Sequence, residues 1–457
     1  MISRRTLLQS VSAGFGYLAF ASLAARQAAA EQGDLNPLAV KEPHFHPRAK
    51  RVIFLCMSGG PSHVDTFDYK PQLAKDDGRQ ARYGGALLKS PWEFKQRGES
   101  GLWISDLFPE VAKHTDRLSL IRSMKCDQPV HTGALTQMHT GTAQFIRPSI
   151  GAWTLYGLGT ENDSLPGFVS LSPQAGNAGT YGSAFLPAIY GGAKIGRGGR
   201  AARFAQYQGA ESVPDIDSKT QSRSAQRRQL DFIQSLNREK LRAQEFSPQI
   251  EGVIESYELA FRMQDALPQA MDLTEETDST LAMYGADAEP TASFGKQCLM
   301  ARRFVESGVR FIEITHGGWD QHVNLRADHA ARAEACDKPI AGLLQDLEQR
   351  GLLDETLVVW GGEFGRTPAA QGSDGRNHNN KGYTTWMAGG GVKGGFSYGA
   401  TDEHGFEAVE NPCHIHDWHA TILHLLGLDH TQLTYRYAGR DFRLTDVHGN
   451  VVKDIIA

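Results

Sequence analysis

Closely spaced cysteines are missing from this sequence. Its five cysteines lie far apart along the chain, and none belongs to a C-x-x-C pair: Cys56, Cys126, Cys298, Cys336 and Cys413. This spacing argues against a zinc site built from cysteines. The odd number leaves at least one thiol unpaired, and several of the five are expected to be small apolar residues of the core.

Long apolar runs and blocks of basic residues are also scarce. The mostly apolar run from Val11 to Leu23 is shorter than the about twenty residues that a membrane-spanning helix needs. The formal net charge is −5, and no basic block stands out beyond the N-terminus. We therefore expect no membrane span in the mature chain and no nucleic-acid partner bound through a basic face.

The first thirty residues contain the parts of an export signal in the usual order. Ser3-Arg-Arg-Thr-Leu-Leu8 is a twin-arginine pattern, the apolar run follows it, and Ala28 to Ala30 offers small residues for a signal peptidase. We expect residues 1–30 to be a twin-arginine signal peptide and residues 31–50 to be a linker. The mature protein is then expected in the periplasm or outside the cell.

Unbroken apolar runs that alternate with helical patterns predict the fold class. Several such runs are expected to be strands buried on both faces: Arg51–Met57, Leu118–Arg122, Val309–Ile314 and Thr356–Trp360. Helical patterns precede the last two runs, at Phe294–Glu306 and Ala331–Arg350. This alternation predicts a three-layer α/β/α fold with a mostly parallel central sheet over residues 51–457.

A segment from about 144 to 289 has a different character. It begins with stretches rich in Gly and Ser and continues into apolar stripes at helical spacing, at Arg223–Leu241 and Ile250–Met263. We expect a largely helical insertion that covers the sheet. Closer to the C-terminus, Asp417–Leu426 predicts a helix, and Tyr435–Phe442 predicts a short strand and turn.

Metal-binding side chains follow the predicted strands. Arg310–His322 runs from an apolar strand through Gly317 and Gly318 into Asp320 and His322. Similar side chains occur in four further segments: Ser58–Asp65, His131–Gly141, Gly361–Asn379 and Cys413–His419. Strand ends of one sheet meet at one edge, which predicts a centre for one or two divalent ions, with zinc, manganese and calcium left open. An Asp that caps the next helix beside an exposed His is the simpler interpretation of the loop.

The order of these elements resembles the alkaline phosphatase and sulfatase superfamily. Its exported, largely uncharacterised branch, domain of unknown function 1501, is similar in several motifs: Gly59–Asp68, Gly362–Pro368, Trp386–Gly395 and His416–Asp429. The resemblance extends from about Arg48 to the C-terminus. It implies a metal-dependent hydrolase of phosphate or sulfate esters, acting on a small-molecule or glycan substrate.

The resemblance implies two sets of metal ligands. Asp320 and His322 match an Asp and a His that bind one metal, for which His416 or His419 is the expected third ligand. For the second metal, Glu363 falls at the position of an Asp, and His378 is its expected partner because Phe364 replaces the usual His. The early carboxylate is missing at Met57 and Ser58, and either Asp65 or His63 is expected in its place.

The nucleophile does not follow from the resemblance. Counting back from Thr140 leads to His131, where the superfamily has Ser, Thr or Cys, and Thr132 is adjacent. The C/S-x-P-x-R sequence of sulfatases is absent. His131 as a nucleophile or a ligand, Thr132, and a metal-bound hydroxide stay open.

The role of Arg366 and the class of the protein each allow two interpretations. Arg366 is expected to hold an anionic substrate oxygen or to form a structural salt bridge. A catalytically degenerate protein that serves as a binding or assembly module of the cell envelope is the alternative to an enzyme.

Overall fold

The computed structural model describes residues 36–457 except 174–177, 197–221 and 244–247. The expected signal peptide, residues 1–30, lies outside the described residues, as do residues 31–35 of the expected linker. Among the residues that are described, no helix is both long and apolar enough to cross a bilayer.

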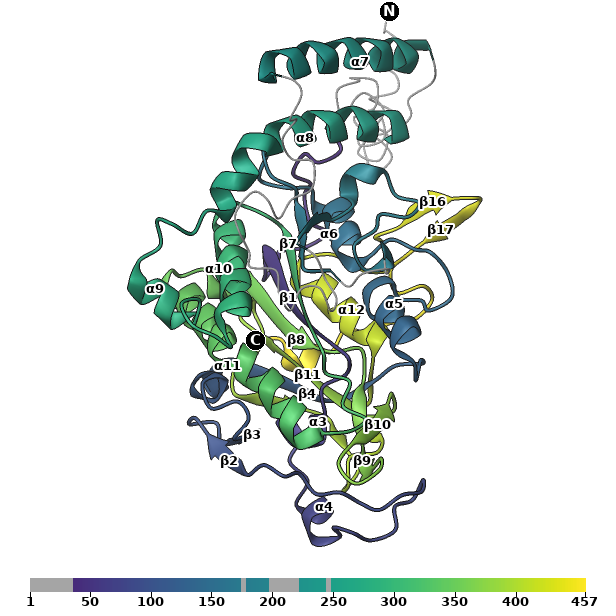
Figure 1. Cartoon of the computed structure of the whole chain (residues 1–457). Helices are drawn as coiled ribbons and strands as arrows, with labels where there is room; N and C mark the ends of the chain where they lie inside the picture. The colour runs from purple at the N-terminus through teal and green to yellow at the C-terminus, as the bar shows by residue number, and fades with distance from the viewer. Residues whose placement is uncertain (1–35, 174–177, 197–221, 244–247) are drawn as a thin grey trace, which may run out of the picture.

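A nine-stranded sheet forms the centre of the described structure (Figure 1). The strand order is β12-β4-β11-β8-β1-β7-β5-β6, and β15 pairs with β4. Its strands are β1 (Arg51–Ser58), β4 (Leu118–Lys125), β5 (Phe168–Leu171), β6 (Ala193–Ile195), β7 (Phe311–Gly317), β8 (Thr356–Gly361), β11 (Tyr383–Ala388), β12 (Phe396–Tyr398) and β15 (Cys413–His414). Among the described strands of this sheet, only β11 pairs antiparallel, with both β4 and β8. The mostly parallel sheet confirms the predicted fold class.

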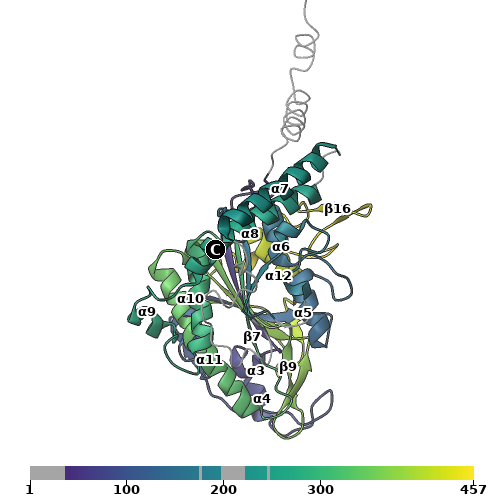
Figure 2. The same cartoon turned by 45° about the horizontal axis from the view of Figure 1, so that its top comes forward.

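Helices cover both faces of this sheet (Figures 1 and 2). One layer contains α10 (Ala292–Glu306) and α11 (Leu325–Gln349), and the other contains α5 (His131–Thr140), α6 (Ile150–Leu158) and α12 (Ile415–Leu425). Successive side chains of a strand point to opposite faces. In β1, therefore, Ile53 and Leu55 join the core beneath α10 and α11, whereas Phe54 and Cys56 join the core beneath α5 and α12.

Short elements lie at the carboxyl end of the sheet. The helix α3 (His63–Thr66) follows β1, and the antiparallel hairpin of β9 (Gly365–Ala370) and β10 (Arg376–Asn379) follows β8. Both lie in the lower part of Figure 1. Further short elements are α4 (Pro71–Lys75), β2 (Phe94–Arg97), β3 (Leu102–Ser105), α9 (Asp278–Met283), β13 (Ala400–Thr401), β14 (Ala408–Glu410), β16 (Tyr435–Tyr437) and β17 (Arg440–Phe442).

The segment 144–289 is only partly an insertion. Its strands β5 and β6 belong to the main sheet, and α6 belongs to a main helix layer. The predicted amphipathic helices are present as α7 (Arg223–Ala243) and α8 (Pro248–Met271). They lie at the upper end of the molecule in Figures 1 and 2, opposite to α3 and β9. They do not cover the carboxyl end of the sheet.

The five cysteines are all free and buried, as expected for residues of the core.

Candidate metal centre

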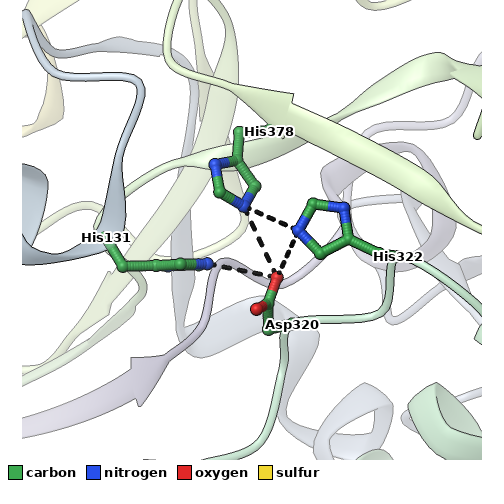
Figure 3. Close-up of side chains that lie close together, drawn as sticks. All are labelled: His131, Asp320, His322 and His378. Atoms are coloured by element: carbon green, nitrogen blue, oxygen red, sulfur yellow. Dashed lines mark hydrogen bonds and ion pairs between the residues drawn. The ribbon is translucent and has the colours of Figure 1, made fainter.

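Four side chains meet at the carboxyl end of the sheet (Figure 3). They are His131 at the start of α5, Asp320 and His322 in the loop after β7, and His378 in β10. One ligand atom from each lies within 4.8 Å of the others. Oδ1 of Asp320 is 3.1 Å from Nε2 of His131, 2.9 Å from Nε2 of His322 and 3.5 Å from Nε2 of His378. We call these four residues the histidine–aspartate cluster.

The glycine turn after β1 allows the Asp320 loop to approach. The pairing of β1 with β7 ends at Ser58 and Gly317, and the Trp319 N–H then donates to the Ser58 carbonyl at 3.3 Å. Gly59 has φ +115°, and a Cβ there would lie only 2.8 Å from the backbone nitrogen of Asp320. A side chain at position 59 would therefore displace the loop that carries Asp320.

Each imidazole of the cluster is oriented by an oxygen behind it. Nδ1 of His131 contacts Oε1 of Glu363 at 2.6 Å. Nδ1 of His322 contacts Oε1 of Gln371 at 2.6 Å, and Nδ1 of His378 contacts the Pro129 carbonyl at 2.7 Å. Oxygens of this kind only accept, so Nδ1 is the nitrogen that carries hydrogen in each contact. In their neutral forms, the imidazoles then present three Nε2 lone pairs to Asp320.

These converging lone pairs fit a cation. Nε2 of His322 and Nε2 of His378 are only 3.0 Å apart, and two lone pairs at that distance repel unless a proton or a metal ion lies between them. Metal-bound histidines typically donate their other N–H to a carboxylate, a carbonyl or a similar acceptor. Three imidazoles and one carboxylate suit zinc, manganese or iron better than calcium.

The electrostatics of the cluster favour positive charge at its centre. Burial raises the pKa of Asp320, but hydrogen bonds with His131, His378 and Arg366 outweigh it and hold the pKa well below its usual range. Burial lowers the pKa of His131, but its hydrogen bonds with Asp320 and Glu363 raise the pKa to about 9. Without a metal, His131 therefore carries a proton at neutral pH, and a metal ion would take that proton's place.

The cluster remains accessible from outside. The side chain of Asp320 is 44% exposed and that of His322 is 33% exposed. A closed structural zinc site has no room for a further ligand, whereas a catalytic site keeps one position open. This exposure therefore suits a catalytic centre.

The structure does not bring His416 and His419 to the cluster, in contrast to the expectation. Both belong to α12, where Nε2 of His416 contacts the Gly141 carbonyl at 2.7 Å and Nε2 of His419 contacts the Met138 carbonyl at 2.6 Å. These carbonyls lie at the C-terminal end of α5, which leaves such groups without helical donors. The two histidines therefore hold α12 against α5, and His378 joins Asp320 and His322 instead.

Asp65 and Glu363 also differ from their expected roles as ligands. Asp65 is buried in α3, and its carboxylate accepts from Nε of Arg376 at 2.7 Å and from Nη2 at 3.1 Å. This ion pair ties α3 to the hairpin that carries His378. Glu363 is completely buried behind His131, and the Gly59 N–H donates to Oε1 of Glu363 at 3.0 Å. Glu363 therefore orients His131 from behind.

Arg366 follows the second of its two expected roles. Its fully buried guanidinium donates to Oδ1 of Asp320 at 2.6 Å and to the carbonyls of Gly59 and Gly60. It therefore positions Asp320 and does not face a substrate. Thr132, next to His131, is exposed on the first turn of α5.

Sequence reasoning did not anticipate Gln371 or the Pro129 carbonyl behind the cluster, because both belong to loops without a recognisable pattern. It also gave no role to Glu313, and it placed His139 among the metal-type side chains of His131–Gly141 without a role of its own. Glu313 gave a usable signal, since it is an acidic residue in the otherwise apolar Phe311–Ile314.

The sequence matches one family over nearly all of the described chain. The model of the family described as "Protein of unknown function (DUF1501)" matches residues 49–456. The match confirms the resemblance that the motifs indicate. No curated protein matches the chain in sequence.

Three solved structures illustrate what the chain is similar to in shape. The lipoteichoic acid synthase LtaP from Listeria monocytogenes is 9% identical, with 89% of this chain and 78% of that chain covered and a TM-score of 0.37. The PsFucS1 sulfatase from Pseudoalteromonas sp. is 12% identical, with coverage of 83% and 68% and a TM-score of 0.36. Alkaline phosphatase from the Antarctic bacterium TAB5 is 12% identical, with coverage of 84% and 99% and a TM-score of 0.32.

Proposed function

The chain belongs to the family of proteins of unknown function DUF1501, and from its site we propose that it is a metal-dependent hydrolase of phosphate or sulfate esters. The observation that carries the proposal is the convergence of three Nε2 atoms on one oxygen of Asp320, each imidazole being held from behind by an acceptor. Such an arrangement is typical of histidines that bind a divalent ion.

The proposed ligands are His131, Asp320, His322 and His378. A divalent ion bound there would polarise an ester oxygen and lower the pKa of a coordinated water. Glu363 keeps the Nδ1 hydrogen of His131 in place, which directs Nε2 toward the centre. Arg366 fixes Asp320 from the opposite side.

The start of α5 supports an anionic substrate. The helix begins at His131, whose side chain belongs to the cluster. The first N–H groups of a helix have no acceptors within the helix, and they favour phosphate-like anions. An ester anion bound at the cluster would thus lie near these donors, on a small molecule or on a glycan.

His131 stands where the alkaline phosphatase and sulfatase superfamily has Ser, Thr or Cys. We therefore assign attack on the ester to water activated at the centre. His131 acts as a ligand in this proposal, since both of its ring nitrogens face carboxylates. Thr132, the residue after His131, is exposed and stays the alternative nucleophile for a covalent intermediate.

His131 at the position of the superfamily's nucleophile also favours the second candidate, an envelope binding or assembly module without catalysis. In both candidates, residues 1–30 are the expected twin-arginine signal, and the mature protein lies in the periplasm or outside the cell. Turnover separates the two candidates.

The test compares wild-type protein with the double variant Asp320→Asn/His322→Ala. Asn at position 320 keeps an acceptor for the buried Arg366, so the variant removes ligands without leaving that charge unpaired. We expect the variant to contain one metal ion per chain fewer than wild type and to hydrolyse neither aryl phosphate nor aryl sulfate. His46→Ala, an exposed histidine outside the cluster, should match wild type. Equal metal content in variant and wild type would refute the proposed site, and metal without turnover would favour the binding module.

A further inference from the structure

A second group of metal-type side chains lies inside the molecule. Cys56 of β1, His139 of α5 and Glu313 of β7 place one ligand atom each within 4.8 Å of one another. All are buried, with exposures of about 1%. No residue is shared with the histidine–aspartate cluster. The group is therefore distinct from the proposed catalytic centre.

The strand register explains how the group forms. Glu313 pairs with Phe54 of β1 and with Ser170 of β5, so its side chain projects from the face of the sheet that also carries Cys56. That face is covered by α5, which supplies His139. The Ser170 hydroxyl is buried on the same face and has no hydrogen-bond partner.

The contact between His139 and Glu313 is incomplete without a cation. Nδ1 of His139 contacts the Leu135 carbonyl at 2.8 Å, so this nitrogen carries the hydrogen and Nε2 is left with a lone pair in the neutral ring. Nε2 lies 3.3 Å from Oε1 of Glu313. Nε2 of His139 and Oε2 of Glu313 are buried without a hydrogen-bond partner.

A proton or a metal ion can occupy this space. A proton would form one imidazolium–carboxylate contact and leave Oε2 of Glu313 bare, which is costly in the interior. A divalent ion would bind the imidazole of His139, the carboxylate of Glu313 and a thiolate from Cys56. The carboxylate and the thiolate carry one negative charge each, and together they balance the two positive charges of the ion. Buried, hydrogen-bonded histidine and thiolate ligands are typical of zinc.

We propose that Cys56, His139 and Glu313 bind a divalent ion of the zinc type inside the fold, with the Ser170 hydroxyl, buried on the same face, as a candidate fourth ligand. The ion would connect β1 and β7 with α5. Because α5 also carries His131 at its first residue, this buried site would fix the helix that supplies one ligand of the outer cluster. The inference does not depend on the proposed hydrolase activity.

Cobalt provides the test, because Co²⁺ bound to thiolate absorbs in the near ultraviolet by charge transfer, whereas Co²⁺ bound only by nitrogen and oxygen does not. The full chain is produced with Co²⁺ as the supplied transition metal. We expect the charge-transfer band in wild type. Cys56→Ser should lose this band and should also contain about one metal ion per chain fewer than wild type. Cys298→Ser, a free and buried cysteine of α10, should keep both.

Further variants cover the other outcomes. Asp320→Asn/His322→Ala should lose the outer ion and keep the thiolate band, so failure of the two proposed sites can be told apart. If Cys56→Ser does not fold, Glu313→Gln should lose the same ion with little change in side-chain volume. A wild-type protein without the band, or a Cys56→Ser or Glu313→Gln protein with unchanged metal content, would overturn the proposal and leave a proton between His139 and Glu313.

Discussion

Two single residues, Glu363 and Arg366, hold side chains of the histidine–aspartate cluster in place from behind. Glu363 is fully buried and holds His131 through a 2.6 Å contact, while Arg366 is fully buried and holds Asp320. Neither side chain is exposed to solvent. Their charges therefore act on the ligands and through them on any bound ion.

Glu363→Gln tests this indirect role. The amide keeps the size of the side chain but removes the charge that favours the Nδ1 hydrogen of His131. We expect affinity for Zn²⁺ at the outer cluster to fall about 10–100-fold, as for other partners behind metal ligands, and kcat/KM to fall when Zn²⁺ is limiting. Competition with a chromophoric chelator measures the affinity. Unchanged affinity would mean that Glu363 does not orient His131.

Asp65 offers the contrasting case of a carboxylate that the sequence suggests as a ligand. In the structure it neutralises Arg376, and both side chains are completely buried. We expect Asp65→Ala to destabilise the protein by about 3–5 kcal/mol, since it leaves a buried charge unpaired. Metal content at saturating Zn²⁺ should stay at the wild-type value. Loss of one ion per chain from a folded Asp65→Ala protein would restore Asp65 as a ligand.

The elements of the fold differ in how well the sequence predicts them. β1, β4, β7 and β8 follow from unbroken apolar runs, and their observed bounds lie within a few residues of the prediction. β11 was not anticipated, although it is the one antiparallel strand of the main sheet. Strand direction depends on the partners that a strand meets in the folded sheet, which local composition does not reveal.

The same limit applies to the site. His131, Asp320, His322 and His378 are all candidates from sequence, yet their grouping into one cluster depends on the β9–β10 hairpin folding toward the loop after β7. His419 illustrates the difficulty, because an Nε2 that binds a metal and an Nε2 that binds the Met138 carbonyl look the same in a sequence. The family resemblance suggested two sets of ligands, whereas the structure groups Asp320 and His322 of the first set with His378 of the second set and with His131.

The packing of α12 against α5 has a consequence for acid stability. Burial lowers the pKa of His419 to about 3, from about 6.5 in an unfolded chain. A lowered pKa of a base means that the folded state binds fewer protons than the unfolded state, so this stability is complete above pH 6.5 and is lost as the pH falls toward 3. His419 can contribute at most about 1.4 kcal/mol per pH unit in that window.

His419→Gln should therefore show a shallower loss of stability between pH 6.5 and 3 than wild type. It should also be less stable at pH 7, because the fit against the Met138 carbonyl is disturbed. Urea unfolding at several pH values gives both quantities. Parallel pH profiles for the two proteins would show that His419 does not titrate in the way described.

The whole molecule has two distinct ends. The candidate centre and the β9–β10 hairpin lie at the carboxyl end of the sheet, whereas α7 and α8 lie at the opposite end (Figures 1 and 2). Shortening the α7–α8 segment should therefore leave metal binding at the outer cluster unchanged. This separation favours a role for α7 and α8 other than covering the substrate.

The proposed export is tested at the scale of the whole chain. Replacing Arg4 and Arg5 by Lys should retain the protein in the cytoplasm with residues 1–30 attached, because the twin-arginine pattern is the expected address. Wild-type protein recovered from the periplasm should begin near residue 31, as determined by mass spectrometry. Export of the Lys–Lys variant in processed form would contradict the assignment of the route.

The most direct measurement is an anomalous-scattering crystal structure of wild-type protein loaded with Zn²⁺. The account predicts an anomalous peak at the outer cluster, about 2.0–2.1 Å from Nε2 of His131, His322 and His378 and in contact with Oδ1 of Asp320. Ordered side chains at these positions with no peak between them would contradict it.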